Sequence, residues 1–430
     1  MKDRTLGIPV KECFFKQASD HLTLLLGSKP AKINLPQNKP LQQLSLFDDY
    51  QVLYAQHIET FRPYFSILHQ NGNRFLQPTY LQLMEDYPPR GMRFVYLLFQ
   101  NKGKTIGFAV GQVLNFNLKE TLLSENSQDA SFWNSIRNNV ANHFNFQLLV
   151  CGTTTVTGQH GFFFRPEVPK TLIPQLLTLG FNTYIQKVDS RVDTIMIKDL
   201  GKDNHDWHKY WKEGNFSQVT FQPNMIFEID PSWSTYGDYL NAMTSKYRVR
   251  AKRAQKKAKA IQTRILSLED IALYEDRIQG LYLDIAQKAD FNMITLHPGY
   301  LKALKERLGD HFTMSGYFLG ETLIGFCTTI ENGEDLEAHF LGVDQEANFE
   351  YQLYLNMLYD MVKQGIEKGT VKRIIFGRTA PEIKSSVGAR AEQVYCYFRH
   401  RNALINKMVP SLISCFEPKV EWTPRHPFGH

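Results

Sequence analysis

The clearest hydrophobic pattern in the sequence is a pair of apolar runs around a glycine turn, and it occurs twice. In the first half, aromatic and β-branched residues fill 94–99 and 105–110, on either side of Gly103. In the second half the same arrangement occupies 314–319 and 322–327. Runs of this composition around a tight turn are typical of β-hairpins.

The two predicted hairpins correspond to each other residue by residue. Gly107 and Gly325 take the same place in their second runs, an offset of 218 residues (325 − 107), or about half the chain. Self-similarity at a fixed offset indicates a duplicated structural unit. We therefore expect two similar domains in these 430 residues, a length that exceeds what one hydrophobic core usually serves.

Further periodicities continue each half beyond its hairpin. Leu353, Met357 and Met361 recur every four residues and predict a helix over 351–367 that ends at Gly369. Most of the other apolar runs predict strands, and one further run predicts a helix in the first half of the chain. The strands are expected at 147–151, 194–197, 224–229, 336–343, 371–376 and 393–398, and the first-half helix at 172–179.

This order of elements predicts an α/β fold of the α+β mixed-sheet type, with helices packed on a mixed sheet in each domain. A lead-in is expected at 1–43, the first domain at 44–230 and the second at 231–430. Hydrophobic residues make up 43% of the chain, and no apolar run approaches the roughly 20 residues of a membrane-spanning helix, so we expect a cytoplasmic protein. The five cysteines and 13 histidines lack ligand spacing, which predicts reduced thiols and no metal site.

Three stretches of the second half carry a resemblance to a known superfamily. They are 245–250 with its basic continuation, 338–344, and 376–384 followed by Gly388-Ala389-Arg390. With the order of elements, they resemble the GNAT N-acyltransferase superfamily, more specifically the branch shared by Fem-type aminoacyl transferases and peptidoglycan-related acetyltransferases. The resemblance covers roughly 235–400; in the first half only the hairpin and the element order carry it.

The resemblance implies two tandem GNAT-like (acyl-CoA N-acyltransferase-like) domains with transferase activity. Such an enzyme moves an acyl or aminoacyl group from a thioester or tRNA ester to an amine. The implied donor is an acyl-CoA such as acetyl-CoA, or an aminoacyl-tRNA, and the acceptor is a small-molecule or peptidyl amine. Because the amine attacks the acyl group directly, the protein must position both substrates, remove a proton and stabilise an oxyanion.

Residues on the predicted strands supply candidates for this chemistry. On the third strand of the second half, alternation places Glu337, His339 and Leu341 on one face and Phe340 on the other. We expect Glu337 and His339 to share the cleft, one as the base and the other as its orienter or as an amine anchor. Tyr397 is a candidate proton donor to a leaving thiolate.

A loop after the following strand is predicted to bind substrate. A glycine opens it, and Arg378, Thr379, Glu382 and Lys384 follow, a combination that suits recognition of a carboxylate or phosphate. Lys384 and Glu382 can instead form a pair on the surface. Tyr354 is a further candidate for substrate contact.

The expected phosphate site departs from the superfamily pattern. GNATs that bind acetyl-CoA usually carry a Gln/Arg-x-x-Gly-x-Gly/Ala loop before the central helix, whereas 344–350 contains no glycine and three carboxylates. A Gly- and Thr-rich loop of the first half, with Gly158 and Gly161, is the better candidate for backbone amides that approach a phosphate. It can also be a turn-rich connection.

The most uneven charge distribution lies between Lys246 and Arg264, where nine residues are cationic and none is acidic. Apolar residues at spacings of three and four predict a helix with basic flanks. Three kinds of anion fit: the phosphates of a CoA or lipid-linked donor, the backbone of an aminoacyl-tRNA, or an anionic polymer or membrane face. The alternative is a solvated, Lys-rich helix with no ligand. We assign Lys246, Arg250 and Arg253 to cofactor binding.

An N-acyltransferase is the leading hypothesis from the sequence. The alternative is a non-catalytic GNAT-fold protein that holds nucleic acid, anionic lipid or an anionic polymer through its basic helix. The two hypotheses differ in whether substitutions at His339 or Arg378 abolish an activity.

Overall fold

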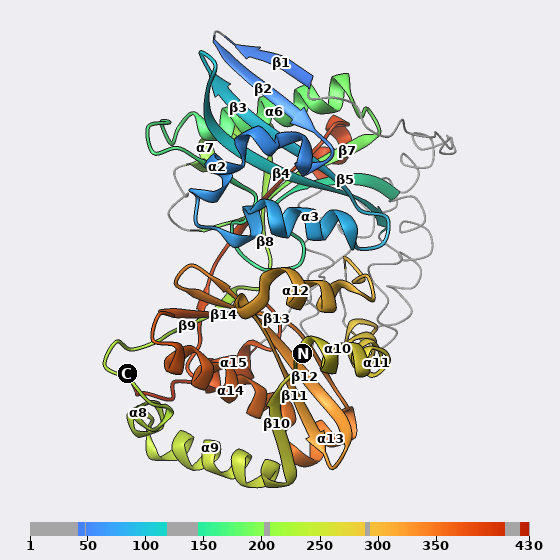
Figure 1. The fold of residues 1–430 in the computed structure, drawn as a ribbon. Coiled ribbons are helices and arrows are strands. Elements are labelled where there is room, and N and C mark those ends of the chain that lie inside the picture. The colour runs from blue at the N-terminus through green and yellow to red at the C-terminus, as the bar shows by residue number, and fades with distance from the viewer. Residues whose placement is uncertain are drawn as a thin grey trace, which may run out of the picture.

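The computed structural model describes residues 42–47, 49–117, 145–201, 207–288, 293–408 and 422–429. They form two separate mixed sheets with helices packed on them, one in the upper and one in the lower half of the molecule (Figure 1). The predicted fold class, mixed α/β with two sheets, is therefore confirmed. The lead-in predicted at 1–43 lies almost wholly outside the described residues.

The first sheet follows the order β1-β2-β3-β4-β5-β7-β16-β8, and β6 pairs with β4. Its neighbours are antiparallel except β5 and β7, which run parallel. The strands are β1 (Gln42–Phe47), β2 (Tyr50–Ala55), β3 (Arg93–Asn101), β4 (Lys104–Asn117), β5 (Asn145–Cys151), β6 (Phe162–Phe164), β7 (Val192–Leu200), β8 (Ser217–Thr220) and β16 (Tyr395–His400).

The second sheet follows the order β10-β11-β12-β13-β14-β9-β15, with one parallel pair, β13 and β14. That pair is short: it ends at Glu337 opposite Ile375, although β13 continues for six more residues. The strands are β9 (Asn224–Glu228), β10 (Ile261–Ile265), β11 (Phe312–Leu319), β12 (Thr322–Asn332), β13 (Asp335–Val343), β14 (Arg373–Gly377) and β15 (Arg390–Glu392).

The hairpins β3–β4 and β11–β12 confirm the duplication read from the sequence. Phe99 pairs with Gly107 and Tyr317 with Gly325, so both partners keep the offset of 218 residues. In each hairpin the register shifts directly after this pair, which leaves one extra residue at the same place in both copies. Two hairpins with the same bulge at the same offset are copies of one unit.

One strand from each predicted half lies in the sheet of the other half. β9, predicted to lead into the second domain, pairs with β14 and β15 in the second sheet. The run at 393–398 was expected in the second domain; it forms β16, which pairs with β7 and β8 in the first sheet. That expectation was wrong because alternation along a strand shows which residues share a face, but not which sheet the strand joins.

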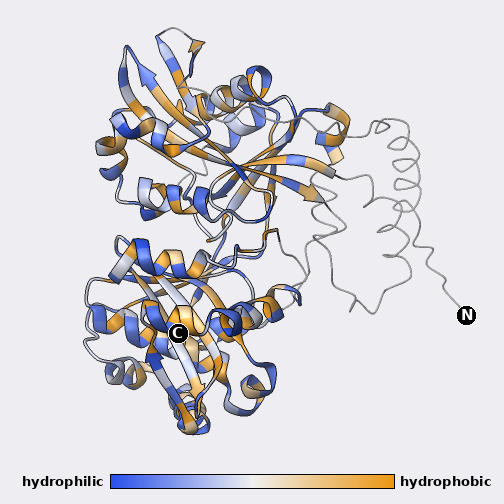
Figure 2. Cartoon of the chain, turned by 45° about the vertical axis from the view of Figure 1, so that its right-hand side comes forward, coloured by the Kyte–Doolittle hydropathy of each residue, from blue (hydrophilic) through white to orange (hydrophobic). Residues whose placement is uncertain are grey.

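Helices cover the outer faces of both sheets, and Figure 2 shows apolar residues gathered along the strands. In the first domain α6 packs on β1 and β3, and in the second α11 and α14 pack on β12 and β13. The longer helices are α3 (Pro78–Asp86), α6 (Ile173–Lys187), α9 (Ser245–Lys257), α11 (Glu275–Ala286), α12 (Tyr300–Leu308) and α14 (Leu353–Lys368), and the shorter ones are α2 (Phe65–His69), α7 (His208–Glu213), α8 (Tyr236–Ala242), α10 (Leu268–Leu273), α13 (Gln345–Tyr351) and α15 (Pro381–Ser386). Gly369 ends α14 with a φ of 67°, as predicted.

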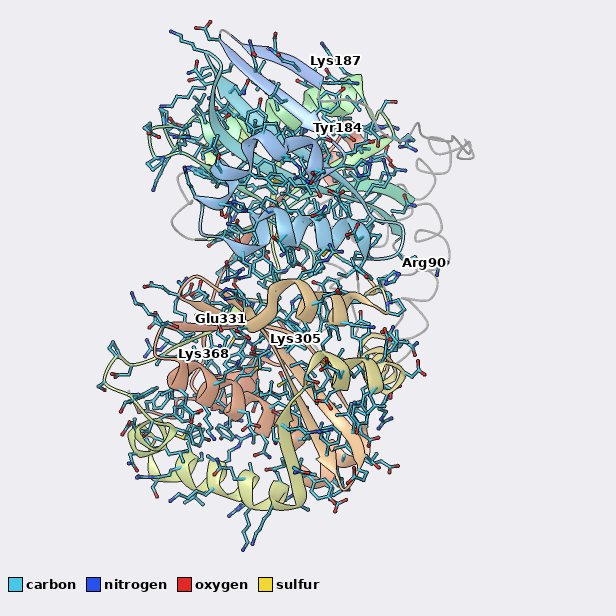
Figure 3. The ribbon with its side chains drawn as sticks, viewed as in Figure 1. Arg90, Tyr184, Lys187, Lys305, Glu331 and Lys368 are labelled. Atoms are coloured by element: carbon cyan, nitrogen blue, oxygen red, sulfur yellow. The ribbon has the colours of Figure 1, made fainter. Side chains whose placement is uncertain are left out.

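The two domains meet through α3 and α12, which pack against each other. Apolar side chains of both domains form one continuous core there. Polar contacts add to it: the Arg74 Nε donates to the Glu331 carbonyl oxygen at 2.5 Å, and Glu331 pairs with Lys368. Figure 3 shows Glu331 and Lys368 near each other in the part of the second domain that faces the first.

A β-bulge in β13 sets the direction of the side chains that face the first domain. The register against β12 shifts around His339 and Phe340, and the buried Thr328 hydroxyl donates to the Phe340 carbonyl oxygen at 2.7 Å and accepts its N–H at 2.9 Å. His339 and Phe340 both contact Tyr300 of α12. The strict alternation that placed Leu341 beside His339 is therefore wrong, because Leu341 packs in the second domain's own core.

No helix in the described part of the chain is long and apolar enough to cross a membrane. Cys151, Cys327 and Cys396 are buried free thiols, and the other two cysteines, Cys13 and Cys415, lie outside the described residues.

Thr328→Val tests the role of the bulge. The substitution keeps the β-branched shape but leaves the N–H and carbonyl of Phe340 without their side-chain partner, which costs about 1–3 kcal/mol of unfolding free energy. Urea denaturation measures this loss. Thr322→Val, an exposed change on the same strand, serves as the control and is expected to shift stability by less than about 0.5 kcal/mol; equal effects of the two substitutions would contradict the assignment.

Candidate functional site

Asp199 is a buried carboxylate on which both domains converge. It follows the apolar run of β7, its backbone φ is 57°, and only 1% of the residue is exposed. Its carboxylate pairs with Lys198 and, across the domain boundary, with Arg378, and it accepts the Gly158 N–H at 3.0 Å. Burial alone would raise the pKa of Asp199, but the two cations lower it to about 2. The group is therefore charged at neutral pH.

Arg378 belongs to a strained loop after β14. Gly377, Thr379 and Ala380 have φ of 71°, 66° and 45°, a left-handed conformation that costs roughly 1–2 kcal/mol in a residue with a Cβ. The guanidinium lies over the Phe221 ring, 5.2 Å from its centroid, and its Nε is buried with no hydrogen-bond partner among the described residues. Arg378 links the two domains in this structure through its pair with Asp199. Its Nε is the nitrogen left without a partner among the described residues, and its predicted contact with substrate would use this atom.

Lys384 holds the same loop in place. It is 4% exposed, and its Nζ donates to the carbonyl oxygens of 376–378 at 2.7, 3.3 and 2.5 Å. Burial lowers the pKa of Lys384 to about 7, while the three carbonyl oxygens favour its ammonium form. The alternative of a surface pair between Lys384 and Glu382 is wrong, because Glu382 pairs with Arg425.

Glu337 is a second buried carboxyl at the domain boundary, and it forms no ion pair with a Lys or Arg among the described residues. It is 2% exposed and is the last residue of β13 that pairs with β14. Its Oε1 lies 3.6 Å from the His160 Nε2 and 3.5 Å from the Asn332 Nδ2. Burial and, to a smaller extent, Asp335 raise the pKa of Glu337 to about 8. At neutral pH the carboxyl is mainly protonated.

Two residues of the first domain orient the neighbours of Glu337. The Asn73 amide nitrogen lies 3.1 Å from the His160 Nδ1; because an amide NH₂ donates, this nitrogen accepts and the imidazole proton resides on Nε2. Burial lowers the pKa of His160 to about 3, so the ring is neutral. The Arg74 N–H donates to the Asn332 Oδ1 at 2.8 Å. Asn73 and Arg74 thus fix both groups beside Glu337.

His339 faces the first domain, as Glu337 does, but it has different partners. Its Nε2 lies 3.0 Å from the Tyr300 hydroxyl, which is 3.2 Å from the Tyr80 hydroxyl, which in turn is 2.6 Å from the Thr155 Oγ1. Burial lowers the pKa of His339 to about 3, and its Nδ1 has no partner in the described part of the chain. Within that part, no hydrogen bond joins His339 to Glu337, so the structure does not pair them as base and orienter.

Tyr397 lies away from Glu337. It is 2% exposed on β16 and stacks on Trp211 with 5.6 Å between ring centroids, in the core on one face of the first sheet. Its neighbour Cys396 points to the opposite face, where its Sγ lies 3.4 Å from the Asp199 Oδ1. The structure thus places the Tyr397 side chain in the core, and its role as a proton donor stays a prediction.

Two further residues that were predicted to contact substrate lie away from Glu337. Tyr354 lies in the first turn of α14, partly buried against the core of the second domain. Thr379 is exposed in the strained loop. Among the described contacts, neither reaches Glu337, and their substrate roles stay predictions.

The basic segment forms a helix that is shorter than expected. α9 ends at Lys257, and the run at 261–265 forms strand β10 because its alternating β-branched residues pair with β11. Lys259 and Arg264 therefore lie outside the helix. Tyr247, Ala251 and Ala254 face the protein body, as the spacing predicts. On its exposed side, Lys246, Arg250 and Arg253 line one pocket of ≈ 440 Å³ together with Arg425.

Neither loop considered for phosphate binding is open in this structure. The 344–350 stretch forms the N-cap and nearly the whole of α13, where the Asp344 carboxylate caps the helix by accepting the Ala347 N–H at 3.1 Å. In the first domain the Gly158 N–H is already donated to Asp199. A Cβ on Gly161 would lie 2.8 Å from the backbone of the neighbouring strand, so this glycine allows close packing of two chain segments.

Several residues of the site were missed in the sequence. Lys198 and Asp199 are charged residues directly after an apolar strand, a signal that could have found them. His160 lies between Gln159 and Gly161 in the loop already singled out, but nothing local indicated its role. Tyr300 carries no signal that separates it from a packing residue, because its contact with His339 joins a helix and a strand that are 39 residues apart in the sequence.

Comparisons with known proteins add the following. No protein-family model matches the sequence, and no curated protein matches it. Among solved structures, FemX is similar with a TM-score of 0.49 and 10% identity, covering 78% of this chain and 94% of that one. A tandem GNAT protein from the clavulanic acid biosynthesis pathway gives 0.45 and 10%, covering 84% and 99%. L-PGS from Bacillus licheniformis gives 0.41 and 10%, covering 77% and 95%.

The site as described is a buried ionic and proton-binding cluster between two domains. Asp199 and Arg378 are charged, whereas Glu337 and the two histidines are neutral at pH 7. Buried groups with such shifted pKa values are typical of functional sites. The described residues contain no group of three or more His, Cys, Asp or Glu side chains that could hold a metal ion.

Glu337→Gln is expected to change how stability depends on pH. The folded carboxyl, with a pKa of about 8, binds its proton more tightly than the unfolded one, whose ordinary value is 4.5. Its contribution to stability is therefore present at low pH and is lost as pH rises from about 4.5 through 8, by at most about 1.4 kcal/mol per pH unit. Gln carries no titrating proton, so the unfolding free energy of the variant should fall less over this range.

Urea denaturation of both proteins at several pH values measures this difference. Glu334→Gln, on an exposed side chain paired with Lys372, is the matched control and should follow the unsubstituted protein. Parallel pH curves for Glu337→Gln and the unsubstituted protein would show that Glu337 titrates normally.

Proposed function

We propose that this protein is an N-acyltransferase that transfers an acyl or aminoacyl group from a thioester or tRNA-ester donor to an amine, with Glu337 as the general base. The observation that carries the proposal is the buried Glu337 carboxyl, whose pKa is raised to about 8 at the point where β13 separates from β14. In the superfamily that the sequence resembles, this third strand forms a wall of the cleft for cofactor and substrate.

The neighbourhood of Glu337 suits the removal of a proton from an amine. An attacking amine becomes cationic as it adds to the acyl carbonyl, and a carboxylate with a pKa near working pH is well matched to accept its proton. The neutral His160 presents its Nε2–H 3.6 Å from the same carboxyl. This N–H donates a hydrogen bond to the developing oxyanion in the proposed reaction. The C–N bond forms as the proton from the amine moves to Glu337. The donor's C–S or C–O bond then breaks, and the proton passes from Glu337 to the leaving thiolate or alkoxide, which restores the carboxylate.

Access to Glu337 requires a change at the domain boundary, because the residue is only 2% exposed in the closed arrangement. The pair between Arg378 and Asp199 crosses that boundary. A substrate carboxylate or phosphate competes with Asp199 for Arg378, so anionic substrate favours the opening in this proposal. The Arg378 Nε, which is buried and has no partner among the described residues, becomes a further donor to such a group once the boundary opens in this proposal.

Glu337→Gln tests the proposed base. Incubation with acetyl-CoA, or with aminoacyl-tRNA, and a panel of amine acceptors is followed by mass spectrometry of the acylated product. The variant should lose roughly 10²–10⁴-fold in kcat/KM, the usual contribution of a general base. The rate of the unsubstituted enzyme should rise with pH and level off above about pH 8, because only the ionised Glu337 accepts a proton.

Glu334→Gln is the control on the same hairpin and should retain activity. Full activity of Glu337→Gln would refute the assignment of the base. If the folded protein transfers no acyl group from any donor yet binds nucleic acid or anionic vesicles, the non-catalytic binding hypothesis replaces the enzyme.

A further inference from the structure

The pocket on α9 lies outside the Glu337 cluster and has a strongly cationic lining. Its walls are Ser245, Lys246, Tyr247, Val249, Arg250, Arg253 and Arg425, with no acidic residue among them. Glu382 touches the rim only through its pair with Arg425. A volume of ≈ 440 Å³ lies within the usual range for small-molecule sites, about 300–1,000 Å³. Four cations around a cavity of this size, one of them paired with Glu382, favour a small anion as the occupant.

The charges on α9 are unfavourable for the helix itself. The first turn of α9 contains no acidic residue and includes Lys246, although a cation is unfavourable at the positive end of a helix. Its N-cap residue, Thr244, makes no side-chain hydrogen bond to the helix. Arg250 lies four residues after Lys246, and Arg253 three residues after Arg250, so like charges also repel along this face. An anion in the pocket relieves all three costs.

A buried hydroxyl of α14 lies within electrostatic range of Arg250. Tyr359 of α14 is 1% exposed, and its hydroxyl has no hydrogen-bond partner in the described part of the structure. It lies close enough to Arg250 for that charge to act against the burial that raises the pKa of Tyr359 to about 12. Buried hydroxyls without partners are uncommon in proteins, but Tyr359 is not among the residues that line the pocket, so it is the lining itself that indicates a ligand.

α9 also covers the position at which GNATs usually hold a pyrophosphate, the N-terminus of the central helix. In the first turns of α14, Leu353, Leu355 and Asn356 are buried. The Asn356 side-chain amide donates to the Ala254 carbonyl oxygen of α9 at 3.2 Å and to the Gln352 carbonyl oxygen at 3.1 Å. α9 therefore packs against the first turns of α14. The same helix offers an open, basic N-terminus of its own.

We propose that the α9 pocket binds the phosphate groups of a small pyrophosphate-bearing molecule. That this molecule is the acyl donor rests on the proposed function, whereas the anion site itself does not. The pocket adjoins α15, because the Arg425 N–H donates to Ser385 at 3.1 Å and its guanidinium pairs with Glu382. α15 directly follows the Arg378 loop, so the pocket and the charged centre lie on successive elements.

The size of the pocket favours a small molecule over a polymer. Arg250 and Arg253 converge on one cavity with Arg425, a residue far away in the sequence. The other exposed cations of α9, Lys252, Lys256 and Lys257, are not part of the lining. An RNA backbone or a lipid surface would contact these lysines at least as well, which gives the experiment its control.

The test compares two double variants of equal charge change by calorimetry with inorganic pyrophosphate and with CoA. Arg250→Gln/Arg253→Gln removes two lining residues, and Lys252→Gln/Lys256→Gln removes two exposed cations outside the pocket; Gln preserves helix propensity in both. We expect the arginine variant to lose about 100-fold in affinity, since a hydrogen bond to a charged group contributes about tenfold. The lysine variant should stay within about threefold of the unsubstituted protein, because non-lining charges act only at long range.

Three results would overturn the proposal: no binding of pyrophosphate or CoA by the unsubstituted protein, equal losses in the two variants, or binding only to tRNA or anionic vesicles that both variants weaken alike. Glu337→Gln separates the two proposals, because it should bind pyrophosphate with unchanged affinity. If that variant also kept full transferase activity, the proposed base would be wrong while the anion site stood.

Discussion

The ion pair between Asp199 and Arg378 is the interaction on which the rest of the domain boundary depends. A carboxylate that is 1% exposed must be compensated, and Lys198 and Arg378 do so from two different domains. Removal of one partner would leave a buried charge and cost about 3–5 kcal/mol. Arg378 is held in position to pair with Asp199 by the strained backbone at 377–380 and by the Lys384 side chain, which donates to the carbonyl oxygens of this loop.

Burial without a cation of its own among the described residues explains the state of Glu337. Both carboxyls are buried at the same boundary, but the nearby cations are paired with Asp199, so Glu337 lowers its free energy by keeping its proton. One carboxyl thus has a pKa of about 2 and the other of about 8. Two titratable groups whose environments separate their pKa values in this way are suited to different tasks in one site. In this account Asp199 organises the boundary and Glu337 exchanges protons.

The local part of this architecture could be predicted from the sequence. The hairpins, the duplication at an offset of 218 residues and the end of α14 at Gly369 follow from runs and turns that neighbouring residues determine. Strand alternation also placed Glu337 and His339 on one face. It failed two residues later, because the bulge held by Thr328 depends on a partner strand. Tyr397 was predicted to reach the site, but it is the adjacent Cys396 that faces Asp199. A strand pattern does not show which face of the strand meets the other domain.

The remaining parts of the site depend on long-range contacts. Asp199 and Arg378 are 179 residues apart in the sequence, and His160 meets Glu337 only where the two domains touch. The exchange of β9 and β16 between the sheets is likewise invisible to any periodicity, although it sets which strands flank the site. The basic helix has one part that the sequence predicts and one part that depends on the fold. Its cationic flank could be predicted, whereas the closure of its pocket by Arg425 required the fold.

The titration of Glu337 itself tests the central claim most directly. Selective ¹³C labelling of glutamate carboxyl groups, with the Glu337 signal assigned by its absence in Glu337→Gln, gives the pKa from the chemical shift as a function of pH. A midpoint near 8 is the result that this account predicts. A midpoint near the ordinary glutamate value of 4.5 would mean that the carboxyl is charged at neutral pH, and would contradict both the electrostatics of the boundary and the proposed base.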